Sequence, residues 1–133
     1  MEKLYKTGLN IDTFEASALL GLRIKYSEKA FDTPTVKKAI KKVCAKLDYA
    51  FSGTLTPTKI AVFSKNRSYE ENGLLIWSSI YARFPVEKDI FKKNFIQFIG
   101  ELATELKQER ISVNFTDESL MVETKYCEKP DLQ

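Results

Sequence analysis

The sequence contains no histidine, and its 133 residues include only two cysteines, five glycines and four prolines. Histidine is the commonest general base at neutral pH and the commonest metal ligand. No glycine-rich phosphate loop is present, and the serines have no histidine partner. We therefore predict a protein that is not an enzyme, with no catalytic residues, no metal site and no cofactor.

Long apolar runs are missing as well. Nowhere do about 18 uncharged apolar residues follow one another, and residues 1–17 contain no apolar core of a signal peptide. Cys44 falls on the apolar side of an expected helix and Cys127 near the end of the chain, so we expect two thiols and no disulfide. These absences predict a cytoplasmic protein without a membrane segment.

The composition is typical of one globular domain. Hydrophobic residues make up 44% of the chain and charged residues 29%, and no stretch rich in proline, glycine or serine divides it. We expect an N-terminal extension or edge strand at residues 1–14, one α+β domain at residues 15–124, and a flexible C-terminal tail at residues 125–133.

The spacing of apolar residues predicts the elements of this domain. Strands are expected at 15–26, 59–64, 74–84, 110–115 and 119–124, and helices within 31–49 and 86–109, with a turn between antiparallel strands at Asn72 and Gly73. The order strand, helix, strand, strand, helix, strand is the split βαββαβ pattern. We therefore predict a ferredoxin-like α+β fold, an antiparallel sheet with two helices on one face and an extra C-terminal strand.

Residues 74–84 carry apolar side chains on both faces of the expected strand. Leu74 and Ile76 point one way, whereas Leu75 and Trp77 point the other. Because both helices are expected on one side, one of these sets must face outward. We assign the set that ends in polar tips to the outer face, which gives six predicted ligand-binding residues: Trp77, Tyr81, Arg83, Arg23, Lys25 and Phe63.

Three explanations of this outer face remain open. Part of the same chain could fold over it, or two copies of the protein could pack sheet to sheet. Alternatively, the face could bind a base-bearing anion, because bases stack on aromatic rings while arginine and lysine contact phosphates. The sequence alone does not choose among them.

The net positive charge of the chain is concentrated in the first expected helix. Residues 34–48 contain five of the 21 basic residues but only one of the 18 acidic ones. This basic helix face is either a solvated surface or a site for nucleic acid, nucleotide phosphates or an acidic protein. It consists of Lys37, Lys38, Lys41, Lys42 and Lys46.

The second expected helix has a wider apolar arc than one sheet contact requires. We expect Ile96, Gly100 and Ala103 to form an interface there, either with the first helix or with a second subunit. Two acidic pairs, Glu70 with Glu71 and Asp117 with Glu118, are expected to be solvated in turns.

Taken together, these features predict a small non-catalytic binding protein. Its partner would be a nucleotide or single-stranded nucleic acid, recognised through the aromatic and basic sheet face. The alternative is a homodimeric protein-interaction module that acts as an adaptor or inhibitor of another macromolecule, as small phage and mobile-element proteins do. In either case a homo-oligomer is expected.

Overall fold

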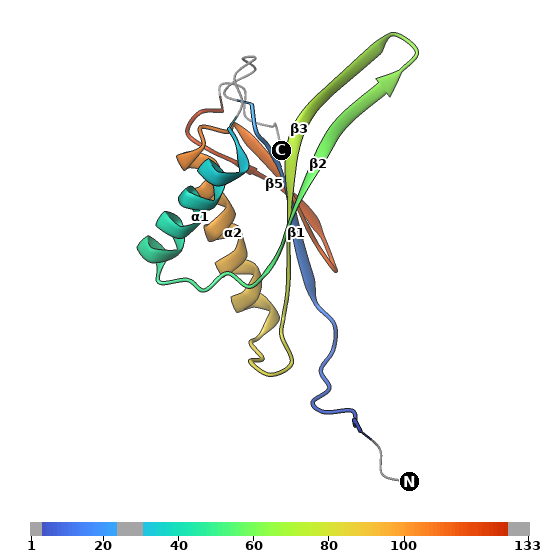
Figure 1. Ribbon diagram of the computed structural model, residues 1–133, viewed down its shortest axis with the longest axis vertical. Helices are drawn as coiled ribbons and strands as arrows, with labels where there is room; N and C mark the ends of the chain where they lie inside the picture. The colour runs from blue at the N-terminus through green and yellow to red at the C-terminus, as the bar shows by residue number, and fades with distance from the viewer. Residues whose placement is uncertain (1–3, 24–30, 128–133) are drawn as a thin grey trace.

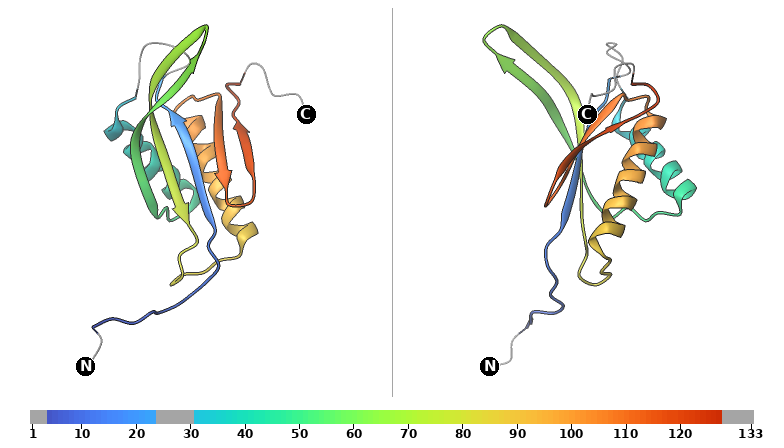
Figure 2. Two further views of the ribbon diagram at one scale, coloured as in Figure 1. Left: turned by 90° about the vertical axis from the view of Figure 1, so that its right-hand side faces the viewer. Right: turned by 180° about the vertical axis from the view of Figure 1, so that it is seen from behind.

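The computed structural model describes residues 4–23 and 31–127. Five strands form one antiparallel sheet in the order β2-β3-β1-β4-β5. Both helices cover the same face of this sheet, as Figures 1 and 2 show. The elements are β1 (Glu15–Gly21), α1 (Thr33–Leu47), β2 (Gly53–Ser64), β3 (Arg67–Ser79), α2 (Lys88–Glu105), β4 (Arg110–Phe115) and β5 (Ser119–Glu123). The predicted ferredoxin-like fold with an extra C-terminal strand is confirmed.

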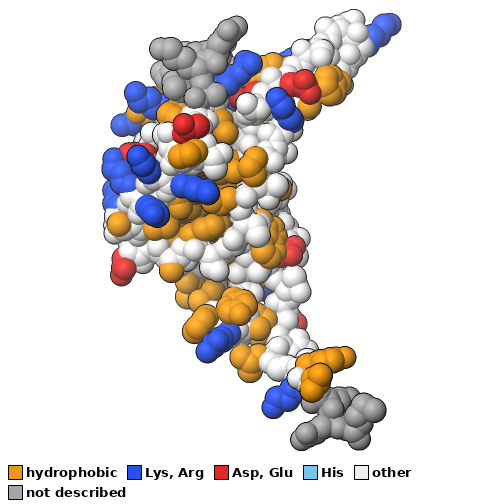
Figure 3. All heavy atoms as spheres, in the orientation of Figure 1, with side chains coloured by type: hydrophobic (Ala, Val, Ile, Leu, Met, Phe, Trp, Pro, Cys, Tyr) orange, Lys and Arg blue, Asp and Glu red, His pale blue; other side chains and the backbone are white. Residues whose placement is uncertain are grey.

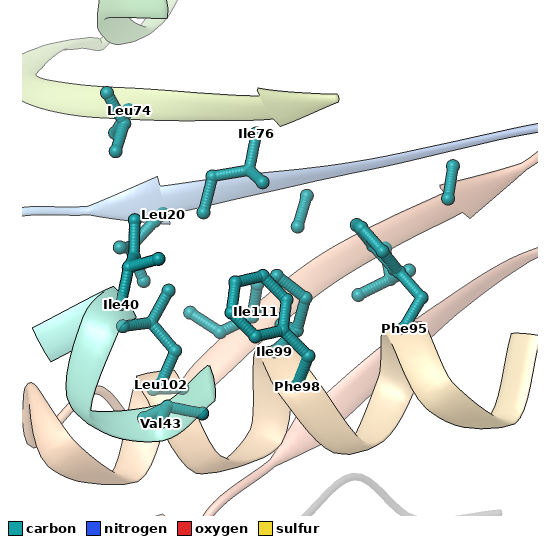
Figure 4. Close-up of a cluster of buried hydrophobic side chains, with 14 of the residues drawn as sticks. Leu20, Ile40, Val43, Leu74, Ile76, Phe95, Phe98, Ile99, Leu102 and Ile111 are labelled. Carbon is teal, nitrogen blue, oxygen red and sulfur yellow. The ribbon is translucent and has the colours of Figure 1, made fainter. Parts of the chain in front are cut away.

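The core lies between the helices and the inner face of the sheet. Alternate residues of the central strands, such as Leu20 and Ile76, point toward Phe95, Phe98 and Leu102 of α2 (Figure 4). All five side chains are at most 1% exposed. This alternation is the reason that β1 and β3 present one fully apolar face to the helices.

Helix α1 begins with a side-chain cap. The Asp32 carboxylate accepts a hydrogen bond from the backbone N–H of Thr35 at 2.8 Å. Hydrogen bonding by the Thr35 side chain, and next by its backbone N–H, lowers the pKa of the Asp32 carboxyl group. Pro34 occupies the first turn, where its missing N–H costs nothing. The helix lies where the sequence predicts it, and Asp32 is its capping residue.

The β2–β3 hairpin is longer than predicted, and it extends beyond the rest of the sheet (Figure 1). Ser64 pairs with Arg67, so the turn lies at residues 65–66, and the predicted turn at Asn72 and Gly73 is wrong. A β-carbon on Gly73 would lie 2.9 Å from Ile60 Cδ1, so this glycine serves close packing within a strand. Pro57 is tolerated inside β2 because β2 is an edge strand.

Other boundaries also differ from the predictions. Strand β1 ends at Gly21 and β3 ends at Ser79, so Pro85 lies in the β3–α2 connection. Helix α2 spans a shorter segment than expected, and Lys107 adopts a φ of 55° in the turn toward β4. Residues 4–14 form no strand, and the part of the predicted first strand at 24–26 lies outside the described residues.

Neither helix in the described part of the chain has the length and apolar character needed to cross a membrane. Neither cysteine forms a disulfide within the described part of the chain, and each is half-buried.

Candidate functional site

The outer face of the sheet, opposite the helices, is uncovered in the described part of the chain (Figure 1). Trp77 lies on this face between Ser17 of β1 and Thr54 of β2, and it is half-buried. Leu75 on the same face is 37% exposed, and Met121 of β5 is 47% exposed. The explanation that described parts of the chain fold over this face is therefore wrong.

A cleft of about 300 Å³ opens at one end of this outer face. Its walls come from β1, the β2–β3 hairpin, the segment that links α2 to β4, and strands β4 and β5. The lining residues that carry the argument below are Gly21, Arg23, Tyr69, Glu71 and Gln108. The cleft thus joins segments that are far apart in the sequence.

Two oxygen-bearing side chains converge above Gly21 in this cleft. A β-carbon on Gly21 would lie 3.3 Å from both carboxylate oxygens of Glu71 and 3.4 Å from Oε1 of Gln108. Only the missing side chain of glycine leaves these oxygens unobstructed at that point. A carboxylate beside an amide oxygen is a suitable environment for a cationic group such as an ammonium.

Gln108 is held in place by its backbone and by its side-chain nitrogen. Its backbone N–H donates to the Ala103 carbonyl at 2.8 Å, and its carbonyl accepts a hydrogen bond from the Thr124 hydroxyl. Its Nε2 donates to the carbonyl of Arg23 at 2.6 Å. Because the amide nitrogen is used in this way, Oε1 is the atom that remains for a ligand in the cleft.

The cleft also carries a positive charge on an aromatic surface. The guanidinium carbon of Arg23 lies 5.2 Å from the centre of the Tyr69 ring, which is the geometry of a cation–π contact. Both side chains are half-buried. A guanidinium is a good partner for a carboxylate, so the cleft presents complementary groups to a zwitterionic ligand.

Of the five predicted ligand-binding residues that the structure describes, only Arg23 lines this cleft. Trp77 lies farther along the outer face, and Phe63 lies near the hairpin turn, 67% exposed. Tyr81 and Arg83 lie beyond the end of β3, where both contact Phe84. Lys25 lies outside the described residues. The structure thus distributes these side chains over several places, and their role in binding stays a prediction.

The sequence analysis missed Glu71, Tyr69 and Gln108. It noted Glu71 only as half of an acidic pair in an expected loop. Had the strand been extended back to Arg67, its alternation would have placed Tyr69 and Glu71 on the outer face and Glu70 on the other. No comparable signal marks Gln108, since its position depends on the turn after α2.

The basic helix face is partly neutralised by α2. Lys42 pairs with Glu105, and Lys46 pairs with Glu101 at 2.9 Å, which raises the pKa of the Lys46 ammonium. Lys37, Lys38 and Lys41 are exposed, and basic side chains gather over α1 in Figure 3. A partner for this face stays a prediction.

The predicted interface on α2 falls mainly inside the protein. Ala103 is fully buried, and Ile96 packs against the core. The nearest atom to a β-carbon on Gly100 would be Val122 Cγ1 of β5, at an ordinary contact distance of 3.7 Å. Gly100 is therefore not explained by a close approach to α1, and a second subunit at this position is untested.

No protein-family model matches the chain, and no curated protein matches it in sequence. Two solved structures of phage SAM lyase are similar to it in fold. The complex with S-methyl-5'-thioadenosine has a TM-score of 0.68 and 14% sequence identity, covering 93% of this chain and 98% of that chain. The apo state has a TM-score of 0.69 and 17% identity, covering 94% and 96%.

This likeness contradicts the prediction of a non-catalytic binding protein, in both its nucleotide-binding and its adaptor or inhibitor form. The proteins that share the fold over nearly the whole chain are enzymes. The prediction rested on the lack of histidine and of a glycine-rich phosphate loop. A lyase adds no water across the bond it breaks, so the commonest use of a histidine base does not arise.

Proposed function

We propose that the chain is an enzyme that cleaves S-adenosylmethionine, and that the cleft at Glu71 binds the substrate. Two kinds of evidence support this proposal. The fold is shared with phage SAM lyase, which binds S-methyl-5'-thioadenosine in one of its structures. The observation that carries the assignment to this cleft is the convergence of Glu71 and Gln108 oxygens above Gly21.

The charges of the substrate match those of the cleft. S-adenosylmethionine carries a sulfonium, an ammonium and a carboxylate. We assign the ammonium to Glu71 and Gln108, and the carboxylate to Arg23. The sulfonium is a less suitable partner for Glu71, because a nearby carboxylate would stabilise its charge in the ground state and oppose the loss of that charge.

We propose that S-methyl-5'-thioadenosine, the compound bound in one structure of phage SAM lyase, is the product, and this choice determines which bond breaks. S-methyl-5'-thioadenosine keeps the methyl and adenosyl groups on sulfur, so cleavage occurs between sulfur and the side-chain carbon of the amino acid. The electron pair of this bond goes to sulfur, and the sulfonium becomes a neutral thioether. No water and no external oxidant or reductant is consumed.

The carbon of the four-carbon fragment that loses its bond to sulfur must form a new bond in its place. We propose that the substrate's own carboxylate attacks this carbon as the bond to sulfur breaks, which closes a lactone. The positive charge of the ammonium is carried into the lactone, so charge and atoms balance. This route needs no protein base, which fits a chain without histidine. The protein's part is to hold the amino-acid end in a folded conformation.

We further propose that the outer face of the sheet is covered by another copy of the chain. Trp77, Leu75 and Met121 form an apolar surface that the described residues leave open. The cleft opens on this same face. A second copy packed here would exclude water from the cleft, and exclusion of water strengthens the charge pairings proposed above.

Product analysis tests the proposed reaction. The purified protein is incubated with S-adenosylmethionine in normal water and in D₂O, and the products are identified by mass spectrometry. We expect S-methyl-5'-thioadenosine and a lactone, or the acid formed when the lactone hydrolyses, with no deuterium on carbon. Deuterium on carbon, or an unsaturated acid, would show elimination and overturn the lactone route. If no S-methyl-5'-thioadenosine forms, the proposed activity is wrong.

A further inference from the structure

The N-terminal arm, residues 4–13, lies away from the body of the protein. Figures 1 and 2 show it continuing beyond the start of β1, on the side of the sheet that faces away from the helices. Residues 4–10 are all exposed, and a β-carbon on Gly8 would meet no atom within 4 Å. In a single copy of the chain, residues 4–10 contact almost nothing, whereas Ile11 and Asp12 at the root of the arm line a cleft together with Ile80, Val86 and Lys88.

The arm is nevertheless apolar at several positions. Leu4 is 100% exposed, Tyr5 83% and Leu9 71%. Single exposed apolar residues are common on protein surfaces, but three within six residues of an extended segment are a concentrated apolar surface. Such a segment gains stability when a partner covers it.

A suitable partner surface lies beyond the end of β3. We call it the loop groove. It is a cleft of about 590 Å³ between the α1–β2 connection, the β3–α2 connection and the first turns of α2. Its walls include Tyr49, Ile80, Tyr81, Phe84, Val86 and Phe91. Three of these are exposed in a single copy: Tyr81 is 60% exposed, Phe84 69% and Val86 48%.

The loop groove also contains a polar group that lacks a partner. Burial raises the pKa of the Tyr49 hydroxyl to about 12, and this hydroxyl forms no hydrogen bond with any described residue. Asn94 and Ser79 line the same groove. An extended peptide carries a backbone carbonyl and N–H at each position, so it can satisfy such groups while its apolar side chains fill the groove.

The groove of the same chain is a poor destination for the arm. At the root of the arm, the Ile80 N–H donates to the Phe14 carbonyl at 3.0 Å, which fixes the direction in which the chain leaves β1. The arm then extends on the face opposite the helices, whereas Tyr49 and Phe91 belong to the helix side. To reach its own groove, the arm would have to reverse around the lower end of the sheet.

We propose that the N-terminal arm of one copy docks into the loop groove of a second copy of this chain. Seven extended residues span roughly 23 Å, which is enough to cross from one copy to a neighbour that packs against it. The exchange is reciprocal, because each copy supplies one arm and one groove. This arm exchange does not depend on the chemistry at Glu71. A negative result for the exchange would leave the proposed lyase activity standing, and a negative result for the activity would leave the exchange standing.

Disulfide trapping between two differently tagged copies tests this contact. The background carries Cys44→Ala and Cys127→Ser. One tagged copy has Leu9→Cys in the arm, the other has Phe84→Cys in the groove, and the two are co-expressed and mildly oxidised. We expect a disulfide-linked dimer that carries both tags. The matched control replaces Phe84→Cys by Lys37→Cys, an exposed position on α1, and should give no such dimer.

A trapped dimer no more abundant than in the Lys37 control would overturn the proposal. A chain that carries both Leu9→Cys and Phe84→Cys provides the complementary test. If it closes a disulfide within one chain and forms no linked dimer, the arm binds its own groove and the proposal is equally wrong.

Hydrogen exchange gives a second measurement that needs no cysteines. In the variant with Leu4→Ser, Tyr5→Ser and Leu9→Ser, the backbone amides of residues 80–86 should exchange about tenfold faster or more, because the covering arm is lost. Amides of β4 should be unchanged. Equal exchange at residues 80–86 in the variant and in the unmodified protein would overturn the proposal.

Discussion

A β-carbon on Gly21 would lie 3.3 Å from each carboxylate oxygen of Glu71. This distance is tighter than most contacts of a β-carbon, so an added methyl group would displace the Glu71 side chain. Gly21→Ala should therefore reduce the rate of S-methyl-5'-thioadenosine formation by on the order of tenfold, since small displacements of a positioning group are costly. The free energy of unfolding should change by less than about 1 kcal/mol.

Gly100→Ala is the matched control for this substitution. It lies inside α2, where a β-carbon would have room 3.7 Å from Val122 Cγ1. Alanine in a helix interior should raise the free energy of unfolding by up to about 1 kcal/mol and leave the rate unchanged. If Gly21→Ala also left the rate unchanged, Glu71 would not be positioned as proposed.

The acid stability of the protein should depend on Lys92. This ammonium lies 2.8 Å from an Asp117 oxygen and 3.0 Å from a Glu118 oxygen, and it holds the β4–β5 turn against α2. The pKa of the Asp117 carboxyl is lowered below its ordinary value of 3.8, chiefly by the hydrogen bond from Lys92. A lowered carboxyl pKa contributes stability above its unfolded value, and this stability is lost as the pH falls through the folded value.

Lys92→Met should therefore destabilise the protein near pH 6, and this destabilisation should shrink toward pH 2, as the pH falls through the lowered pKa of Asp117. Chemical unfolding at both pH values measures this difference. Lys93→Met is the control, because Lys93 is exposed and is not paired with an acid among the described residues. A difference between Lys92→Met and the unmodified protein that stays constant with pH would contradict the role given to this ion pair.

A charge placed on the outer face of the sheet should weaken the association of two copies of the chain. Leu75→Asp places a charge beside Trp77 on the outer face, where we propose that a second copy packs. The dissociation constant of the oligomer should rise about tenfold or more, because a charge buried at an apolar contact is costly. Light scattering over a range of concentrations measures it, with circular dichroism to verify the fold. Lys41→Asp on α1 is the control. A single-chain mass for the unmodified protein would contradict the proposed packing.

The exposed lysines of α1 should be dispensable for the reaction. Lys38 and Lys41 lie on the helix side of the sheet, whereas the cleft opens on the outer face. The double substitution Lys38→Glu with Lys41→Glu should leave the rate and its dependence on salt unchanged, as measured by S-methyl-5'-thioadenosine formation between low and moderate ionic strength. A rate that falls, or a salt dependence that disappears, would give the basic helix face a role in substrate binding.

The sequence predicts the fold well because the fold depends on local patterns. The spacing of Val36, Ile40 and Val43 identifies α1, and the alternation of Ile111, Val113 and Phe115 identifies β4. The β2–β3 hairpin was predicted less well. Its outer half is polar on both sides and projects beyond the sheet, so no alternation toward a core marks it.

The candidate site was harder to predict because it is formed by contacts between distant segments. Glu71, Gln108 and Gly21 come from three elements, and only the register of β1 against β3 brings the first and last together. The sequence did predict the outward direction of Trp77, but it left open whether part of the same chain covers that face. It could not indicate that the important end of this face lies at the cleft.

The rate of S-methyl-5'-thioadenosine formation in Glu71→Gln, compared with Glu70→Gln, tests the proposed site most directly. The two residues are neighbours on β3, but alternation places Glu71 in the cleft and Glu70 on the other face. We predict that Glu71→Gln lowers the rate by about 100-fold, as expected when a charged partner of the substrate is lost, and that Glu70→Gln stays within about twofold of the unmodified protein. Equal rates in the two variants, both well folded, would contradict the assignment of the substrate to this cleft.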